Sequence, residues 1–379
     1  MENKINKIKL LMKESSLTAI LISSVSNIIY LTDYCGFSYF EREAFLVITN
    51  KENYLITDGR YGQAVSSIAG FKLIEISSSN TLTKIFEDLS KKIKKIGIEE
   101  NDLSVAEYRK IRKYFKTVNL ADLQSLRIIK DSFEIKSIEK ACKFGDEAFD
   151  HILGKIKKGV TERKLAFEIE FFIKKKGADI SFPPIVAFSA NSSIPHHKTS
   201  NRKLKTDNII LLDFGVKYQN YCSDMTRTIF FGKADHKFKK IYKTVLESQQ
   251  KAIDYLASSF YPRSSADKKV KASNVDRVAR KHITDNGFPT IPHSLGHGIG
   301  IEVHEQPRLS PKSKDILKEG MVFSIEPGIY ISGYGGVRIE DIFVIESFTS
   351  RRAEPSSGQS LRTAAGRRLT HSPKHLIEI

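Results

Sequence analysis

The 379-residue sequence contains no tryptophan, only three cysteines and no hydrophobic run of membrane-spanning length. A transmembrane helix needs about 20 predominantly apolar residues, so none is expected. The first residues, MENKINKIKL, lack the apolar stretch of a secretory signal peptide. Cys35, Cys142 and Cys222 form no CxxC pair and cannot all pair within one chain, which fits a reducing compartment. These absences predict a cytoplasmic protein without a membrane partner.

Acidic residues are scarce relative to basic ones, because 44 Asp and Glu face 61 Lys and Arg, a net charge of +17. The lysines are dispersed along expected helical faces, as in KKIKK at 91–95 and IKKKG at 173–177, without interleaved aromatic residues. A basic surface can bind nucleic acid. The dispersal fits solvated helix faces better, so no nucleic-acid partner is expected.

The length predicts two domains, and a hydrophobic content of 40% suffices for two globular cores. Apolar residues at helical spacing over 5–12 precede strand-like runs, and the segment VNLADLQSLRIIKD places the domain boundary near residue 125. Helices are then expected over 134–156, 161–176, 238–257 and 273–286. At the last of these, Ser273 with Asp276 resembles a capping box, and Gly287 is a plausible stop.

Five side chains of the second part suggest a metal site: Asp213, Asp224, His297, Glu326 and Glu340. Four carboxylates and one imidazole suit a pair of divalent cations better than they suit a protein core. A hairpin turn at 217–220 would place Asp213 directly opposite Asp224, where like charges are destabilising. Two dications about 3.5 to 4 Å apart would offset that repulsion.

The other candidate ligands lie in equally suggestive segments. PHSLGHGIG places His293 and His297 among glycines, where the backbone can approach a site closely. Glu326 and Glu340 lie within the apolar runs FSIEPGIY and GVRIEDIFVI, where a buried glutamate is costly unless it is paired or bound to metal. Each acid alone is more often a solvated strand residue or half of an ion pair. The five together favour a metal site.

The motifs LLDFGVKYQNYCSDMTRT, SLGHGIGIEVHEQPR, SIEPGIY and GGVRIED resemble the metallopeptidases of the pita-bread fold, in the aminopeptidase P and prolidase branch. The resemblance covers essentially the whole chain. It implies an α+β fold in which a creatinase-like or prolidase-like α/β domain, residues 1–125, precedes a pita-bread catalytic domain, residues 126–379.

The resemblance also implies the metal ligands. Asp213 would bind one ion, His297 and Glu326 would bind the other, and Asp224 and Glu340 would bridge the two. Ligation dominated by carboxylates favours Mn²⁺, with Co²⁺, Zn²⁺ or Fe²⁺ as alternatives.

Further residues match the family around the metal centre. By resemblance, His293 and His304 would hold the scissile peptide and stabilise the oxyanion, and His196 would help to shape the substrate pocket. Arg338 would contact the metal ligands without binding an ion itself. Arg308 would be either a clamp for the carboxylate of a short substrate or a surface charge.

The implied reaction is hydrolysis of the bond between an N-terminal residue and proline by a hydroxide that bridges two metal ions, with Glu326 taking and returning the proton. The enzyme would be an Xaa-Pro aminopeptidase, and an Xaa-Pro dipeptidase, or prolidase, shares every motif. A non-catalytic binding module of the same fold is the alternative of another class, but all five ligands are present here. The expected partners are peptides with proline at the second position and a second copy of the chain in a homodimer.

Two stretches depart from the family pattern, at 258–269 and at 350–370. The second, SRRAEPSSGQSLRTAAGRRLT, holds five arginines but no lysine, valine, isoleucine or phenylalanine. This composition predicts an exposed in-frame insertion, disordered or loosely helical, while an integral surface loop is the alternative.

Overall fold

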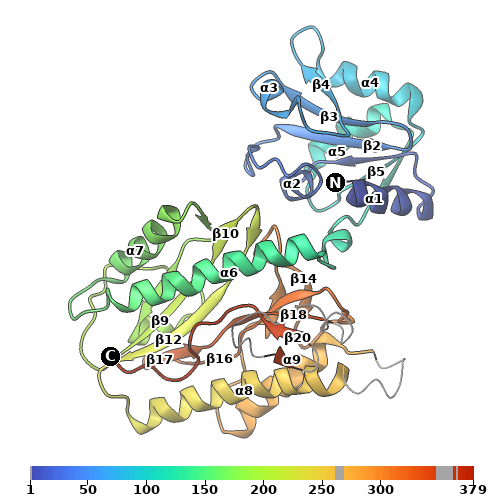
Figure 1. Ribbon diagram of the computed structural model, residues 1–379. Helices are drawn as coiled ribbons and strands as arrows, with labels where there is room; N and C mark the ends of the chain where they lie inside the picture. The colour runs from blue at the N-terminus through green and yellow to red at the C-terminus, as the bar shows by residue number, and fades with distance from the viewer. Residues whose placement is uncertain (1, 261–268, 347–361, 364–365) are drawn as a thin grey trace. The chain divides into compact units, whose positions relative to one another are not determined.

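The computed structural model describes residues 2–260, 269–346, 362–363 and 366–379. The chain divides into two compact units after Arg127 (Figure 1). Helices and sheets occur in both, and the α+β prediction is confirmed. None of the described helices is long and apolar enough to cross a membrane. The cytoplasmic location and the homodimer stay predictions.

The first unit is built on one mixed six-stranded sheet in the order β4-β3-β2-β1-β5-β6. Its strands are β1 (Ala19–Ile22), β2 (Ala44–Thr49), β3 (Asn53–Asp58), β4 (Lys72–Ile76), β5 (Lys95–Ile98) and β6 (Thr117–Leu120). Its helices are α1 (Glu2–Glu14), α2 (Val25–Thr32), α3 (Gly62–Val65), α4 (Leu82–Lys92), α5 (Val105–Tyr114) and the 3-10 helix η1 (Gln124–Arg127). The predicted first helix is confirmed, because Ile5, Ile8 and Met12 form the buried stripe of α1.

The second unit contains two helix pairs and several short sheets. Its helices are α6 (Ser132–Leu153), α7 (Glu162–Lys175), the 3-10 helix η2 (Ser189–Ser193), α8 (His236–Phe260) and α9 (Ala272–Asp285). The strands of its first half are β7 (Asp179–Ile180), β8 (Ile185–Phe188), β9 (Asn208–Phe214), β10 (Val216–Tyr218), β11 (Tyr221–Cys222) and β12 (Met225–Phe231). Those of its second half are β13 (Gly296–Gly298), β14 (Glu305–Leu309), β15 (Val322–Ile325), β16 (Gly328–Ile331), β17 (Gly335–Arg338), β18 (Asp341–Ile345), β19 (Arg362–Thr363) and β20 (Gly366–Arg368).

Each half of this unit has its own hydrophobic core. Buried residues of α6 and α7 pack on the β12-β9-β8 sheet, and buried residues of α8 and α9 pack on the sheet β14-β13-β15-β18-β20-β19. Figure 1 shows the strands between the two helix pairs. The apolar faces of the helices therefore cover the sheets from both sides and leave the strand ends to carry polar residues.

The four helices predicted for this unit are confirmed, with ends that differ by a few residues. Gly287 follows α9 with a φ of 80°, a conformation that favours glycine. The predicted capping box of Ser273 and Asp276 is wrong. The cap of α9 is Lys271, which makes no side-chain capping bond, and the carboxylate of Asp276 points into the protein instead.

The predicted hairpin is present, but its register corrects one expectation. Tyr218 pairs with Tyr221 across a two-residue turn, in which Gln219 and Asn220 have φ angles of 46° and 69°. Thr226, not Asp224, lies opposite Asp213. The expectation that the two aspartates lie directly opposite each other is therefore wrong. Because side chains alternate between faces, Asp224 is on the same face as Asp213 but on the diagonal.

The range predicted for the insertion, 350–370, is too long at its C-terminal end. Residues 350–361 and 364–365 lie outside the described residues, as do residues 261–268 of the other unusual stretch. Residues 366–370, however, are integral to the second unit, because β20 pairs with β18 and Leu369 is only 1% exposed. The prediction that this end is exposed is wrong, because strand pairing, the burial of Leu369 and the hydrogen bond from Thr370 to Asp341 hold it on the second unit.

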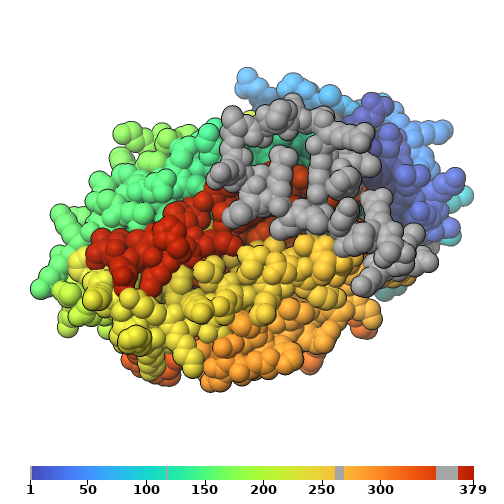
Figure 2. All heavy atoms as spheres, turned by 60° about the horizontal axis from the view of Figure 1, so that its bottom comes forward, coloured from blue at the N-terminus to red at the C-terminus, as the bar shows by residue number. Residues whose placement is uncertain are grey.

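The residues after β20 continue across the second unit. The backbone of His371 and Ser372 donates to Asp146 of α6, and the Tyr242 hydroxyl of α8 donates to the carbonyl of Lys374. Figure 2 shows these C-terminal residues, in red, between the surfaces of α6 and α8. The C-terminal segment thus joins the two halves of the unit.

Candidate metal centre

The five predicted ligands lie at or beside the ends of strands in the second unit. Asp213 is on β9, Asp224 directly precedes β12, and His297 is the middle residue of β13. Glu326 directly follows β15, and Glu340 directly precedes β18. Segments that are more than a hundred residues apart in sequence therefore converge on one place.

Three of the five form a group that could hold a metal ion. Asp224, His297 and Glu340 are buried, and one ligand atom from each lies within 4.8 Å of the others. The Nε2 atom of His297 is 3.6 Å from Asp224 Oδ2 and 3.4 Å from Glu326 Oε1. Glu326, with 15% of its side chain exposed, therefore borders the same group.

Burial and mutual repulsion raise the pKa values of these carboxyl groups. Burial, followed by the charges of Glu340 and Asp213, raises the pKa of Asp224 well above its usual range. Burial and then Asp213 raise the pKa of Glu340 to about 7. Burial and then the charge of Glu340 also raise the pKa of Glu326 well above its usual range. The four carboxylates are thus close enough to repel one another.

Two oxygens of the group lack hydrogen-bond partners among the described residues. These are Oδ1 of Asp224 and Oε1 of Glu340, both fully buried. A buried acceptor without a partner costs about 1 to 3 kcal/mol, and more when it is charged. Divalent cations bind carboxylate oxygens and imidazole nitrogens, so the donor set fits a metal.

The imidazole of His297 is arranged to act as a ligand. Burial lowers its pKa to about 3, so the ring is neutral at pH 7. Nδ1 lies 3.1 Å from the Gly298 carbonyl, which assigns the ring proton to Nδ1. The lone pair of Nε2 then faces Asp224 and Glu326, as metal ligation requires.

Arg338 connects two of the carboxylates. Its Nη2 donates to Asp213 Oδ2 at 2.6 Å, and its Nε donates to the Thr226 hydroxyl at 2.9 Å. That hydroxyl donates in turn to Glu340 Oε2 at 2.7 Å. Arg338 therefore bonds directly to Asp213 and, through Thr226, to Glu340. Thr226 was missed, although its position two residues after Asp224 on a strand indicates a shared face.

Tyr330 is a second residue that the sequence did not reveal. Its hydroxyl accepts from Arg338 Nη1 at 2.8 Å and lies 2.9 Å from His293 Nε2. Two glycines make room for the ring, since a Cβ at Gly328 would be 2.5 Å from the hydroxyl and one at Gly336 would be 2.6 Å from Cδ1. The glycines of these strands thus allow a tyrosine to reach the centre.

His293 is close to the site but is already engaged. Nδ1 lies 2.8 Å from the Ser294 carbonyl and 3.8 Å from Glu326 Oε2, while Nε2 faces Tyr330. Burial, followed by the charge of Arg338, lowers the pKa of His293 to about 4. The ring is therefore neutral and bonded through both nitrogens.

The remaining candidates lie at the edge of the centre. The ring of His304, an exposed residue, is 4.4 Å from that of His297 between centroids. His196 is also exposed. Burial raises the pKa of Asp213, and the charge of Arg338 and then that of His196 act to lower it. Arg308 is paired with His297 between β14 and β13, and its side chain is exposed.

The loop that carries His196 is organised by a buried acid that the sequence did not single out. Glu162, the first residue of α7, is fully buried. Its carboxylate accepts from the backbone of Phe188 at 2.8 Å and from that of Ser200 at 2.9 Å, and it lies 3.0 Å from His197 Nε2. His197, for which the sequence suggested no role, therefore anchors the loop.

Several known proteins are similar to this chain in sequence and structure. Residues 136–347 match the model of metallopeptidase family M24, and residues 4–129 match the creatinase/prolidase N-terminal domain. An uncharacterised peptidase of Bacillus subtilis is 35% identical over 381 residues, which cover 99% of each chain. An Xaa-Pro dipeptidase of Pyrococcus horikoshii is 34% identical over 93% of this chain and 97% of its own.

Solved structures show the same relationship. The Xaa-Pro dipeptidase from Bacillus anthracis has a TM-score of 0.84 at 31% identity and covers 100% of this chain and 99% of its own. The X-Pro aminopeptidase from Thermotoga maritima has a TM-score of 0.83 at 30% identity over 99% of both chains. The resemblance stated from the motifs is confirmed: this chain belongs to metallopeptidase family M24 and carries a creatinase/prolidase N-terminal domain.

Proposed function

We propose that this protein is an Xaa-Pro peptidase that requires two divalent metal ions, and that it is an aminopeptidase. The observation that carries the metal requirement is the cluster of four carboxylates with little exposure, in which two buried oxygens lack a partner among the described residues. The preference for proline is supported by the relatives named Xaa-Pro dipeptidase and X-Pro aminopeptidase. Because relatives of both names occur, Xaa-Pro dipeptidase activity is the second candidate.

The proposed ligands divide between two ions. Asp213 would bind one ion, His297 and Glu326 would bind the other, and Asp224 and Glu340 would bind both. Two divalent cations would balance the four negative charges of the carboxylates. Mn²⁺ is the preferred ion because oxygen ligands dominate, with Co²⁺, Zn²⁺ or Fe²⁺ as alternatives.

Each part of the proposed site has its own role in the reaction. When bound, divalent ions supply a nucleophilic water at neutral pH and polarise the scissile carbonyl. Glu326 accepts the proton of the water and returns it to the proline nitrogen, which leaves. The attack places negative charge on the carbonyl oxygen, and a preorganised donor beside this oxygen lowers the barrier.

His304 is the preferred donor to that oxygen. Its ring is beside His297 at the exposed edge of the site, whereas both nitrogens of His293 already have partners. A role for His293 in holding the substrate would require Nδ1 to leave the Ser294 carbonyl. His196 would border the substrate pocket, and Arg308 would attract the carboxylate of a short substrate.

Proline needs a dedicated site because the Xaa-Pro bond is a tertiary amide without an N–H and its ring fixes φ. Purified protein should be assayed with the dipeptide Ala-Pro, the tripeptide Ala-Pro-Ala and its matched control Ala-Ala-Ala, with Mn²⁺ and with a chelator. We expect Mn²⁺-dependent cleavage of Ala-Pro-Ala and little cleavage of Ala-Ala-Ala.

The other results would select the alternatives. Cleavage of Ala-Pro alone would establish a dipeptidase, and equal cleavage of both tripeptides would remove the proline preference. If the protein bound Mn²⁺ but cleaved none of the peptides, it would be a binding module of this fold.

A further inference from the structure

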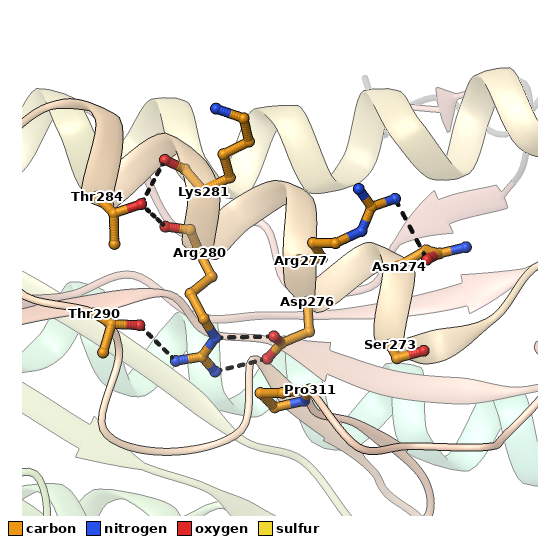
Figure 3. A pocket seen from close by; sticks show the side chains of 9 residues that line it. All are labelled: Ser273, Asn274, Asp276, Arg277, Arg280, Lys281, Thr284, Thr290 and Pro311. Atoms are coloured by element: carbon orange, nitrogen blue, oxygen red, sulfur yellow. Dashed lines mark hydrogen bonds and ion pairs between the residues drawn. The ribbon is translucent and has the colours of Figure 1, made fainter.

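Asp276 and Arg280 of α9 form an ion pair that faces the interior. Only 1% of the Asp276 side chain is exposed, and 18% of the Arg280 side chain. Nε and Nη2 of Arg280 donate to the two carboxylate oxygens at 2.9 and 2.8 Å, as Figure 3 shows. Such two-point pairs fix the planes of both groups relative to each other. Asp276 is the residue that the sequence assigned to a capping box, and this pair is what it does instead.

The other donors of Arg280 bind the segment that leads to His293. Nη1 donates to the Thr290 hydroxyl at 3.1 Å and to the Ile291 carbonyl, and Nη2 donates to the His293 carbonyl at 2.9 Å. An arginine has five N–H donors in a fixed plane. The two bonds to Asp276 and these three use all of them, so the guanidinium ties α9 to the loop at three points.

Asp276 extends the connection to a predicted ligand. Its Oδ1 accepts from the backbone N–H of Leu295 at 3.2 Å. The carbonyl of Leu295 accepts from the backbone N–H of Glu326 at 2.8 Å. Leu295 also directly precedes β13, which carries His297. One ion pair therefore supports the segment that leads into β13 and, through Leu295, the backbone of Glu326.

The hollow beside α9 in Figure 3 does not indicate a ligand site. Arg280 has no donor left for a ligand. The other two cations that line the hollow, Arg277 and Lys281, are exposed and already bond to Asn274 and Asp285. The arrangement therefore suits support of the backbone rather than capture of an anion.

We propose that the Asp276–Arg280 pair is a positioning device that holds His293 and the backbone of Leu295 and Glu326 in the geometry needed for hydrolysis. Its effect on turnover rests on the proposed Xaa-Pro peptidase function. Both residues bond to the 290–295 segment, and they act through it. A displacement of about 1 Å at a reacting centre can cost on the order of 10²-fold in rate.

The kinetic test uses two conservative variants. Arg280→Lys keeps the charge but loses the planar fork, and Asp276→Asn keeps the shape but loses the charge. With saturating Mn²⁺, well below the melting temperature, we expect kcat on Ala-Pro-Ala to fall by about 10- to 100-fold while KM changes less than about threefold. Arg277→Lys, on the exposed side of α9, is the matched control and should stay within about twofold of the parent.

A second measurement does not depend on activity. Hydrogen exchange of the backbone amides in 290–297 should be faster in Arg280→Lys and Asp276→Asn than in the parent and in Arg277→Lys. Unchanged exchange, or a kcat within about twofold in the folded variants, would overturn the positioning role. If the parent protein hydrolysed no Xaa-Pro peptide, the proposed function would fail, but the exchange result would still decide whether the pair holds the segment.

Discussion

Glu340 and Asp341 are adjacent, and both are almost completely buried, yet their surroundings are opposite. Burial and the charge of Asp213 raise the pKa of Glu340 to about 7. Burial also acts to raise the pKa of Asp341, but the charges of Arg227, Arg368 and Lys374 outweigh it and hold that pKa far below its usual range. The two adjacent residues thus have opposite surroundings: burial and Asp213 outweigh Arg338 around Glu340, whereas three cations outweigh burial around Asp341.

The hydrogen bonds show the same difference. Asp341 accepts from Arg227 at 2.7 Å, from Thr370 at 2.6 Å and from Gln249 at 3.1 Å. Glu340 accepts from Thr226 through one oxygen, while the other has no partner among the described residues. The comparison teaches that burial alone does not define a functional acid. Both carboxylate oxygens of Asp341 are bonded within the protein, whereas the cluster around Glu340 would be completed by the proposed cations.

Neutralising one acid of the cluster should have the largest effect on activity. Asp224→Asn removes the charge of a proposed bridging ligand, so Mn²⁺ should bind more weakly and hydrolysis should fall by about 10³-fold or more. The metal-free variant should nevertheless be at least as stable as the metal-free parent, because a like-charge repulsion is gone. Metal content, kcat/KM and urea unfolding check these outcomes. Near-normal activity with saturating Mn²⁺ would contradict the assignment.

Neutralising Asp341, the acid that is surrounded by cations, should instead lower the stability of the protein. Asp341→Asn leaves Arg227 without its buried counterion and should destabilise the protein by about 3 to 5 kcal/mol at pH 7. Because the folded pKa of Asp341 lies below the unfolded value of about 3.9, this contribution is full above that pH and is lost as the pH falls further. Urea unfolding of both proteins from pH 7 to 3 should show the difference shrinking below about pH 4. A constant difference would contradict the account.

The sequence located the cluster but not the network beside it. The five candidate ligands lie in compact motifs, whose residue types suggested a shared metal site. The predicted register of the Asp213 hairpin was wrong because the turn lies one residue later than expected. This displacement moves the partner of Asp213 from Asp224 to Thr226. The partners of Asp341 include Arg227, which lies in the first motif, and Thr370 and Lys374, which lie near the C-terminus outside the motifs. Nothing in the sequence indicates that these residues meet. Thr370 was assigned to the predicted insertion on the composition of residues 350–370. Composition does not indicate that its hydroxyl bonds to Asp341.

The C-terminal stretch gives the smallest expected effect and a matched contrast. Deleting 350–361 should leave Xaa-Pro hydrolysis within about twofold, roughly 0.4 kcal/mol in barrier, because the composition of these residues differs from that of the rest of the chain. Extending the deletion through Thr370 also removes β20 and two partners of Asp341, Arg368 and Thr370. The longer deletion should therefore lower the melting temperature strongly. Equal stability of the two deletions would contradict the role given to residues 366–370.

The central claim is that the cluster around Glu340 is completed by two cations. In the metal-free protein, the raised pKa of Glu340, about 7, means that folding takes up protons, so stability should fall as the pH rises from about 4.3 to 7. Calorimetric titration with Mn²⁺ near pH 6, in two buffers of different ionisation enthalpy, measures both the number of ions bound and the protons released. The account predicts two ions per chain and net proton release. Binding of one ion or none, or binding without proton release, would contradict it.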